Sequence, residues 1–269
     1  IGKYDVTIGQ YTAFLNAVDP GGTNPYGLYN SGMATDLNIA GIAFTSGAAS
    51  GSKYAVMSGS GNKPITYVSW FDAARFANWM QNGQGSGSTE TGAYTLNGVT
   101  VGYAPAKNSG ATFWIPTENE WYKAAYYDPT NEDNGGYWAY AAKTDTAPEN
   151  TIGSNANQAN YRVANAFSVT QSATYSSSQN YLTDVGAFTG STSFYGTFDQ
   201  SGLVYQWNDL DGSSDMSRGL RGGDWIDFNA FSLSSSYRYT YNAYQGDFSS
   251  GFRLCLLYTS PSPRDQRGS

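Results

Sequence analysis

The chain has 269 residues, of which 40% are hydrophobic, 16% aromatic and 13% charged, and its formal net charge is −7. This length and hydrophobic content suffice for a sizeable core, whereas the acidic balance argues against nucleic acid or an anionic membrane as partner. The chain has no histidine, which excludes His-based triads and His-ligated zinc or iron sites. Its single cysteine, Cys255, excludes an internal disulfide and any two-cysteine metal site.

Three short helices are predicted in the first half of the chain, each by a capping residue followed by an apolar face. The first follows Thr7. The second follows Ser69, with Asp72 at the capping-box position, and the third follows Thr117, with Glu120 at the equivalent position. A strand-like run precedes each helix, at Lys3–Val6, Ile65–Val68 and Thr112–Ile115.

The rest of the chain predicts one domain with long surface insertions. Gly/Ser/Asn-rich loops cover 41–62, 82–92 and 150–180, and from 181 onward short aromatic segments between turns predict twisted antiparallel strands. No apolar run approaches the ~20 residues of a membrane span. The chain begins without Met, so we expect a domain over 1–256 that is truncated at its N-terminus. Residues 257–269 are expected to form a non-native or disordered tail.

Six segments occur in an order that resembles the formylglycine-generating enzyme family, also called the sulfatase-modifying factor domain family. They are VTIGQYTAFLNAV (6–18), PITYVSWFDAARFANWM (64–80), WIPTENEWYKAAYY (114–127), YGTFDQSGLVYQW (195–207), RGGDW (221–225) and GFR (251–253). The resemblance implies an α+β fold of the C-type lectin-like, sulfatase-modifying factor type. Such a fold has little regular secondary structure, with short helices and small twisted antiparallel sheets.

The resemblance does not extend to the family's catalytic residues. Enzymes of the family oxidise a substrate cysteine with Cu(I) held by two thiolates between the RGG-type and GFR-type motifs. Here 224–250 contains no cysteine, and the corresponding positions fall near Asp227 and within 231–233. Because Cu(I) needs soft sulfur ligands, we do not expect copper. Cys255 lies beyond GFR and is expected to be a small buried hydrophobe. The iron-dependent branch of the family requires histidines, which are absent.

Calcium is the cofactor that the resemblance leaves open. In one family site, the side chains of Asp199 and Gln206 and the carbonyls of Gly202 and Val204 would be the ligands. Gln206 stands where the family usually has Glu, which lowers the expected affinity, and a metal-free loop is an equal alternative. A second site would use Asn160 and the Tyr161 carbonyl, but its usual carboxylate falls in the Ser-rich run 176–178.

Other charged residues favour structural roles. The acidic segment containing Asn208, Asp209, Asp211, Gly212 and Asp215 is more typical of a solvated turn than of a calcium loop. Glu118 and Glu120 favour the N-terminus of the third helix over a catalytic pair. Three arginines, Arg221, Arg238 and Arg253, are expected to tie loops together through their donors.

The segment 224–250 is rich in Ser, Tyr, Phe, Asp, Asn and Ala, a composition favoured in antibody-like binding surfaces. Alternation predicts that Tyr237, Tyr239 and Tyr241 share one face of a strand. The candidate ligand-binding residues are Trp225, Asp227, Phe228, Asn229, Phe231, Tyr237, Tyr239, Tyr241, Asn242 and Tyr244. We therefore expect an exported, monomeric, non-catalytic module that binds a protein or glycan. The alternatives are an oxidase with a divergent site and a calcium-stapled envelope module.

Overall fold

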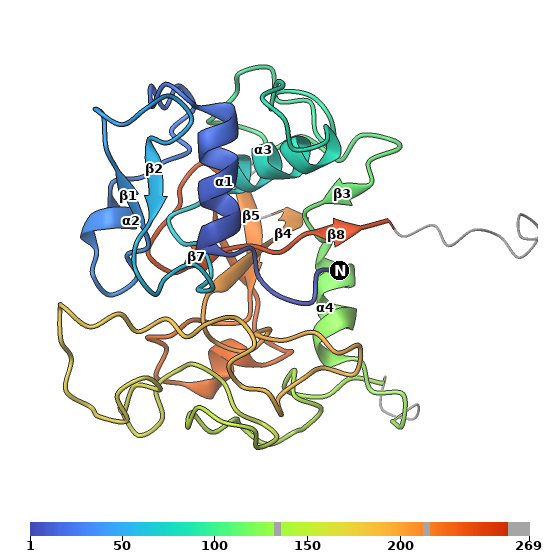
Figure 1. Ribbon diagram of the computed structural model, residues 1–269. Helices are drawn as coiled ribbons and strands as arrows, with labels where there is room; N and C mark the ends of the chain where they lie inside the picture. The colour runs from blue at the N-terminus through green and yellow to red at the C-terminus, as the bar shows by residue number, and fades with distance from the viewer. Residues whose placement is uncertain (132–135, 212–215, 258–269) are drawn as a thin grey trace, which may run out of the picture.

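The computed structural model describes residues 1–131, 136–211 and 216–257 (Figure 1). All three predicted helices are present: α1 (Ile8–Val18), α3 (Trp70–Gln81) and α4 (Glu118–Tyr126). Each begins with a capping box, in which Gln10, Asp72 and Glu120 return a hydrogen bond to the capping residue. A short helix, α2 (Gly32–Thr35), and a 3-10 turn over Ala230–Leu233 are additional elements.

The strands form three small sheets. Strands β1 (Ile42–Phe44) and β2 (Tyr54–Val56) pair antiparallel, as do β3 (Phe113–Trp114) and β8 (Cys255–Leu256). A four-stranded sheet has the order β6 (Tyr239–Asn242), β5 (Ser217–Arg221), β4 (Tyr205–Asp211), β7 (Ser250–Gly251). The fold is therefore α+β with little regular secondary structure, as predicted.

Two strand predictions need correction. Strands β4 and β7 are parallel, so the four-stranded sheet is mixed and not purely antiparallel. Of the three predicted strand-like runs, only the third contains a ladder strand, β3. The other two are irregular, with bends at residues 3, 4 and 67 and a left-handed φ of 59° at Tyr67. Val6 N–H donates to the Phe252 carbonyl at 2.9 Å, and Ile65 N–H donates to the Val6 carbonyl at 3.0 Å.

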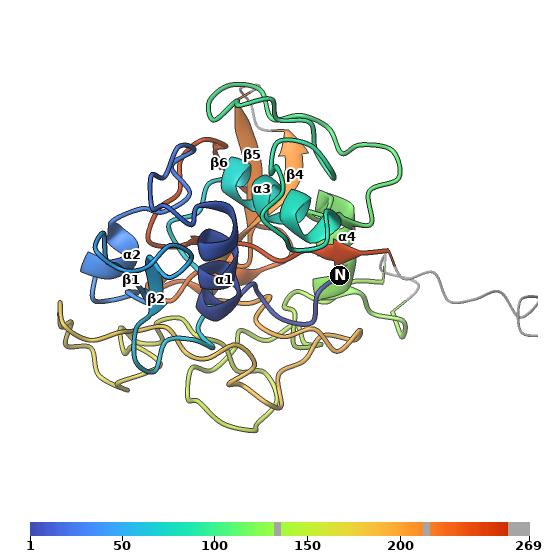
Figure 2. The same cartoon turned by 45° about the horizontal axis from the view of Figure 1, so that its top comes forward.

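The main core lies between α1, α3 and the four-stranded sheet, which runs through the centre of the molecule (Figures 1 and 2). Aromatic rings dominate it: Phe76 contacts both Phe14 and Phe252 edge-on, each with ring centroids 5.3 Å apart. The irregular segment 150–200 forms the lower part of the view in Figure 1. A second buried cluster there includes Phe167, Tyr181 and Trp225.

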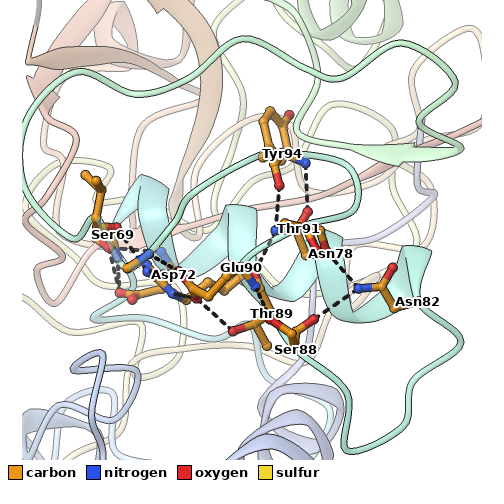
Figure 3. Close-up of polar contacts among 12 residues, drawn as sticks. Ser69, Asp72, Asn78, Asn82, Ser88, Thr89, Glu90, Thr91 and Tyr94 are labelled. Atoms are coloured by element: carbon orange, nitrogen blue, oxygen red, sulfur yellow. Dashed lines mark hydrogen bonds and ion pairs between the residues drawn. The ribbon is translucent and has the colours of Figure 1, made fainter.

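Polar side chains of α3 fix the loop that follows it (Figure 3). The side chain of Asn78 donates through Nδ2 to the backbone carbonyls of residues 89 and 94. Its side-chain oxygen Oδ1 accepts the Tyr94 N–H at 2.7 Å. Asn82 donates to the carbonyls of residues 88 and 91. Arg75 makes two hydrogen bonds to the Glu90 carboxylate, at 2.8 and 3.0 Å. These bonds place Tyr94 against the N-terminal end of α3, where its ring contacts Trp70.

Some predictions fall outside the described residues. Gly212 and Asp215 of the acidic segment lie there, as does nearly all of the predicted tail, at 258–269. Among the residues that are described, no helix is long and apolar enough to cross a membrane.

Candidate functional site

Arg221, at the end of β5, fastens the segment 224–250 to helix α4. Its guanidinium pairs with the Glu118 carboxylate through Nε, at 2.8 Å, and through Nη2. Its Nη1 donates to the carbonyls of Ser235 and Tyr237. Because Arg221 is buried, this ion pair is shielded from solvent and holds the loop in place.

Arg253 closes the segment from its other end. Its Nη2 lies 2.9 Å from Asp5 Oδ1, and its Nε donates to Gln206 Oε1 at 2.6 Å. Further bonds reach the carbonyls of Gly2 and Phe198. Both side chains of the ion pair are fully buried. Arg221 and Arg253 thus have the structural role predicted for them.

A turn of two aspartates follows the first framing arginine. Asp224 Oδ1 accepts the N–H groups of Ile226 and Asp227, at 3.0 and 2.9 Å, and Asp227 Oδ2 accepts the Asp224 N–H at 3.0 Å. Burial raises the pKa of both carboxyls, and the neighbouring Asp227 raises that of Asp224 further. Tyr205 and Ser232 donate to Asp227. Hydrogen bonds from backbone N–H groups to these two carboxylates therefore hold the turn with which the segment 224–250 begins.

The candidate ligand-binding residues divide by exposure. Phe228, Phe231 and Tyr239 are 75%, 54% and 39% exposed, and Asn229 is exposed as well. The half-buried members are Asp227, Tyr237, Tyr241, Asn242 and Tyr244. Trp225, by contrast, is only 2% exposed, because its ring is stacked on Tyr181 with centroids 5.1 Å apart. The structure therefore places Trp225 in the core and not on the surface.

Five aromatic residues of the segment, Phe228, Phe231, Tyr237, Tyr239 and Tyr241, are named here the aromatic face. Tyr239 and Tyr241 share one side of β6 as the alternation predicts, with ring centroids 6.2 Å apart. Tyr237 precedes β6 and contacts Phe231 instead, at 5.4 Å. The face is solvent-accessible at three of its five rings, so it presents apolar area without being a closed pocket.

Buried residues and backbone hydrogen bonds fix the chain that bears the aromatic face. Leu233 is fully buried, and its carbonyl accepts the Tyr126 hydroxyl at 3.0 Å. Ser235 N–H donates to the Ala139 carbonyl at 2.8 Å. Tyr205 of β4 was not predicted to belong here, yet its ring lies 5.7 Å from that of Tyr239. The only sequence signal for Tyr205 was its place in the segment 195–207.

Comparison with known proteins identifies the fold. The family model described as "Sulfatase-modifying factor enzyme 1-like domain" matches residues 1–256. The chain belongs to this family. The crystal structure of CarF is similar to this sulfatase-modifying factor domain, with 19% identity and a TM-score of 0.55 over 95% of this chain and 85% of that one. At such identity the similarity concerns the fold alone.

Two further solved structures are similar over much of their length. Treponema denticola variable protein 1 has 16% identity and a TM-score of 0.43, covering 94% of this chain and 82% of its own. PvdO from Pseudomonas aeruginosa has 18% identity and a TM-score of 0.45, covering 94% and 77%. No curated protein matches the chain.

The residues at the family's copper position do not fit copper. The two positions fall near Asp227 and within 231–233, where the side chains of Asp227 and Ser232 supply hard oxygen atoms. Cu(I) binds such donors poorly. Cys255 is buried beyond the segment, as expected, and burial raises the pKa of its thiol to about 12, which disfavours the thiolate.

The residues of the first calcium site do not fit a calcium ion either. Gln206 Oε1 accepts from Trp121 Nε1 at 2.7 Å and from Arg253 at 2.6 Å, so both of its lone pairs are used. One of these donors is a buried cation, whose charge opposes a second cation beside it. Asp199 accepts the Gly186 N–H through Oδ2 at 2.7 Å. One partly engaged carboxylate with the backbone carbonyls of Gly202 and Val204 would be a poor site for calcium.

At the second calcium site, the Tyr161 carbonyl accepts from both Asn150 and Ser168 at 3.1 Å, so its lone pairs are used. Asn160 donates through Nδ2 to the Tyr181 carbonyl at 3.0 Å, a bond that does not occupy its side-chain oxygen. Within the described ranges, no group of three or more Cys, Asp and Glu residues is placed to hold a metal ion.

The two glutamates of α4 act separately. Glu120 completes the capping box and accepts from Trp114 Nε1 at 2.9 Å. Glu118 pairs with Arg221 and also with Arg238, whose Nε lies 3.0 Å from the same oxygen. Sequence placed Glu118 at the helix N-terminus but gave no sign that it anchors the segment 224–250 from more than 100 residues away.

Proposed function

We propose that this sulfatase-modifying factor domain is a non-catalytic, exported module that binds a protein or a glycan through the aromatic face. The observation that carries the proposal is the exposure of Phe228, Phe231 and Tyr239 on a segment whose backbone is fixed by buried anchors. Rigid aromatic rings give contact area at low entropic cost, as in antibody-like binding surfaces. The low charge and the abundance of Ser, Thr, Asn and Gly support export.

The surroundings of the aromatic face support recognition. Arg238, with 62% of its side chain exposed, lies between Tyr237 and Tyr239 in the sequence. Arginine and tyrosine are enriched at binding hot spots. Asn229 and Ser236 are exposed and supply adaptable hydrogen bonding.

The test is a binding screen of the purified protein against a glycan array and a displayed peptide library. The matched pair of variants is Phe228→Ser/Phe231→Ser on the face and Phe194→Ser/Tyr195→Ser elsewhere, since Phe194 and Tyr195 are each 48% exposed. We expect the first variant to lose at least about ten-fold in affinity for the selected ligands, the effect of a hot-spot residue. The second variant should bind as the unmodified protein does. Ligands that bind all three proteins equally, or no ligand at all, would refute the proposal.

A further inference from the structure

Strand β6, at one edge of the four-stranded sheet, has no strand beside it on its outer side. Strands β6, β5 and β4 lie in this order across the sheet (Figure 2). Among the described residues, β6 pairs with β5, and no further ladder or isolated bridge reaches it. At the opposite edge, both residues of β7 are buried. In β6, by contrast, the first residue is exposed and the other three are half-buried.

The register of β6 shows which of its backbone groups point away from β5. Ala243 N–H donates at 2.8 Å to the carbonyl of the residue before β5, and the same register continues through all of β6. In an antiparallel ladder, successive residues direct their N–H and C=O groups to opposite sides. Tyr239 and Tyr241 therefore direct these groups to β5, like Ala243. The groups of Arg238 and Thr240 point to the outer side.

The outer side thus presents unpaired backbone donors and acceptors. Within the part of the chain that the structure describes, neither the N–H nor the C=O of Arg238 makes a hydrogen bond. Those of Thr240 follow one strand position later, on the same side. Such a row of alternate N–H and C=O groups is a template for pairing with another extended backbone.

The usual protections of an edge strand are missing from β6. Proteins commonly guard an exposed edge with a charged residue, a proline or a β-bulge. The sequence of β6, YTYN, has no charge and no proline. Its register with β5 has no shift, whereas that between β4 and β5 has one. The nearest charge, Arg238, is held by Glu118 on the neighbouring helix α4, at 3.0 Å.

We propose that the partner of the aromatic face is an extended peptide segment of another protein, which adds to β6 as a further strand. The inference rests on the proposed function and narrows it, because backbone N–H and C=O groups at this spacing match a polypeptide and not a glycan. Alternate side chains of the added strand would lie beside Tyr239 and Tyr241, which belong to the aromatic face. Aromatic and β-branched residues form favourable cross-strand pairs with such rings.

Hydrogen exchange of single amides, followed by NMR, tests the edge directly. The probes are peptides that the protein enriches from a displayed library, synthesised with blocked ends. In the free protein, we expect the Thr240 amide to exchange at least about ten-fold faster than those of Tyr239 and Tyr241, which β5 protects. A saturating peptide should slow the Thr240 amide at least about ten-fold.

A contrary result would separate this inference from the proposed function. If a peptide lost affinity for Phe228→Ser/Phe231→Ser but left exchange at Thr240 unchanged, the aromatic face would bind it without strand addition. The inference would then be overturned, and the proposed function would stand. Binding of glycans alone would have the same meaning, whereas the absence of any ligand would refute both.

The decisive variant is Thr240→Pro, and its matched control is Thr240→Val. Proline removes an N–H that points away from β5, so the ladder with β5 keeps its hydrogen bonds. Valine leaves the backbone unchanged. We expect Thr240→Pro to bind the peptide at least about ten-fold more weakly and Thr240→Val to bind it within about two-fold of the unmodified protein. Equal affinities of the two variants would overturn the proposal.

Because proline also fixes φ, a second measurement leaves the protein unmodified. The enriched peptide is synthesised with a single N-methyl group at each position in turn. We expect methylation at alternate positions to weaken binding about ten-fold and methylation between them to be tolerated, since only every second amide of an added strand faces β6. Equal tolerance at all positions would contradict strand addition. A dimer of the protein that Thr240→Pro disperses would assign the edge to a second copy and would also overturn the proposal.

Discussion

The framing arginines and the residues between them differ sharply in environment. Arg221 and Arg253 are buried and each makes several bonds to backbone and carboxylate groups, whereas Arg238, inside the segment, has 62% of its side chain in solvent. The two framing arginines, here called the frame, therefore stabilise the fold. Exposed residues between them, here called the interior of the segment, are available to contact a ligand. A family motif can persist in such a frame while the residues between its ends differ.

The largest expected effect comes from breaking the frame. Arg253→Met should lower the free energy of unfolding by about 3–5 kcal/mol, because it removes the partner of the buried Asp5 carboxyl and of the Gly2 and Phe198 carbonyls. Arg238→Met should cost no more than about 1 kcal/mol, because its ion pair is largely solvated. Urea unfolding measures both. Equal losses for the two variants would remove the distinction between frame and interior.

A second comparison can be made within the segment. Trp225→Ala should cost about 3–5 kcal/mol, since its buried ring packs between Tyr181 and Phe248. Phe228→Ala, at an exposed site, should change stability by no more than about 0.5 kcal/mol. Thermal unfolding followed by circular dichroism would show the difference. If Trp225→Ala lost as little stability as Phe228→Ala, Trp225 would not anchor the segment.

The pH dependence of stability tests the environment of the buried Asp199 carboxyl. Burial raises the pKa of Asp199 to about 6, above its value of 3.8 in an unfolded chain, so the folded state holds that proton more tightly. The stabilisation from this tighter proton binding amounts to up to about 3 kcal/mol. It is complete below pH ~4 and is lost as the pH rises through about 6. Stability measured from pH 4 to 7 should fall less in Asp199→Asn than in the unmodified protein. If the stability of both proteins fell equally between pH 4 and 7, the raised pKa of Asp199 would be contradicted.

The smallest expected effect is that of calcium. Because Gln206 is occupied by Arg253 and Trp121, millimolar calcium or a chelator should move the melting temperature by no more than about 1 °C. Differential scanning calorimetry with and without calcium is sufficient. A rise of several degrees would show that the loop rearranges to bind the ion and would restore the envelope-module alternative.

Local rules predicted the helices correctly, and the resemblance to the sulfatase-modifying factor family predicted the fold class. The capping residues Thr7, Ser69 and Thr117 fixed three helix starts, because a cap and its partner are only three residues apart. Strands were harder to predict: β3 and β8 are two residues long and pair across more than 130 positions. The parallel pairing of β4 with β7 also depends on contacts that no local pattern encodes.

Composition singled out the segment 224–250, but where each of its side chains lies could not be predicted from the sequence. Composition indicated an aromatic binding surface over 224–250, whereas burial of Trp225 depends on loop 167–181, which lies far away in the chain. The roles of Glu118 and Tyr205 likewise arise from long-range contacts.

The most direct test of the central claim is an assay for the family's chemistry. The purified protein is incubated with Cu(I) and a cysteine-containing sulfatase peptide, and aldehyde formation is followed by mass spectrometry. Because Asp227 and Ser232 offer oxygen where thiolates are needed, we predict no aldehyde above a metal-free control. Aldehyde that depends on copper would show that the segment 224–250 retains catalysis and would contradict its assignment to recognition alone.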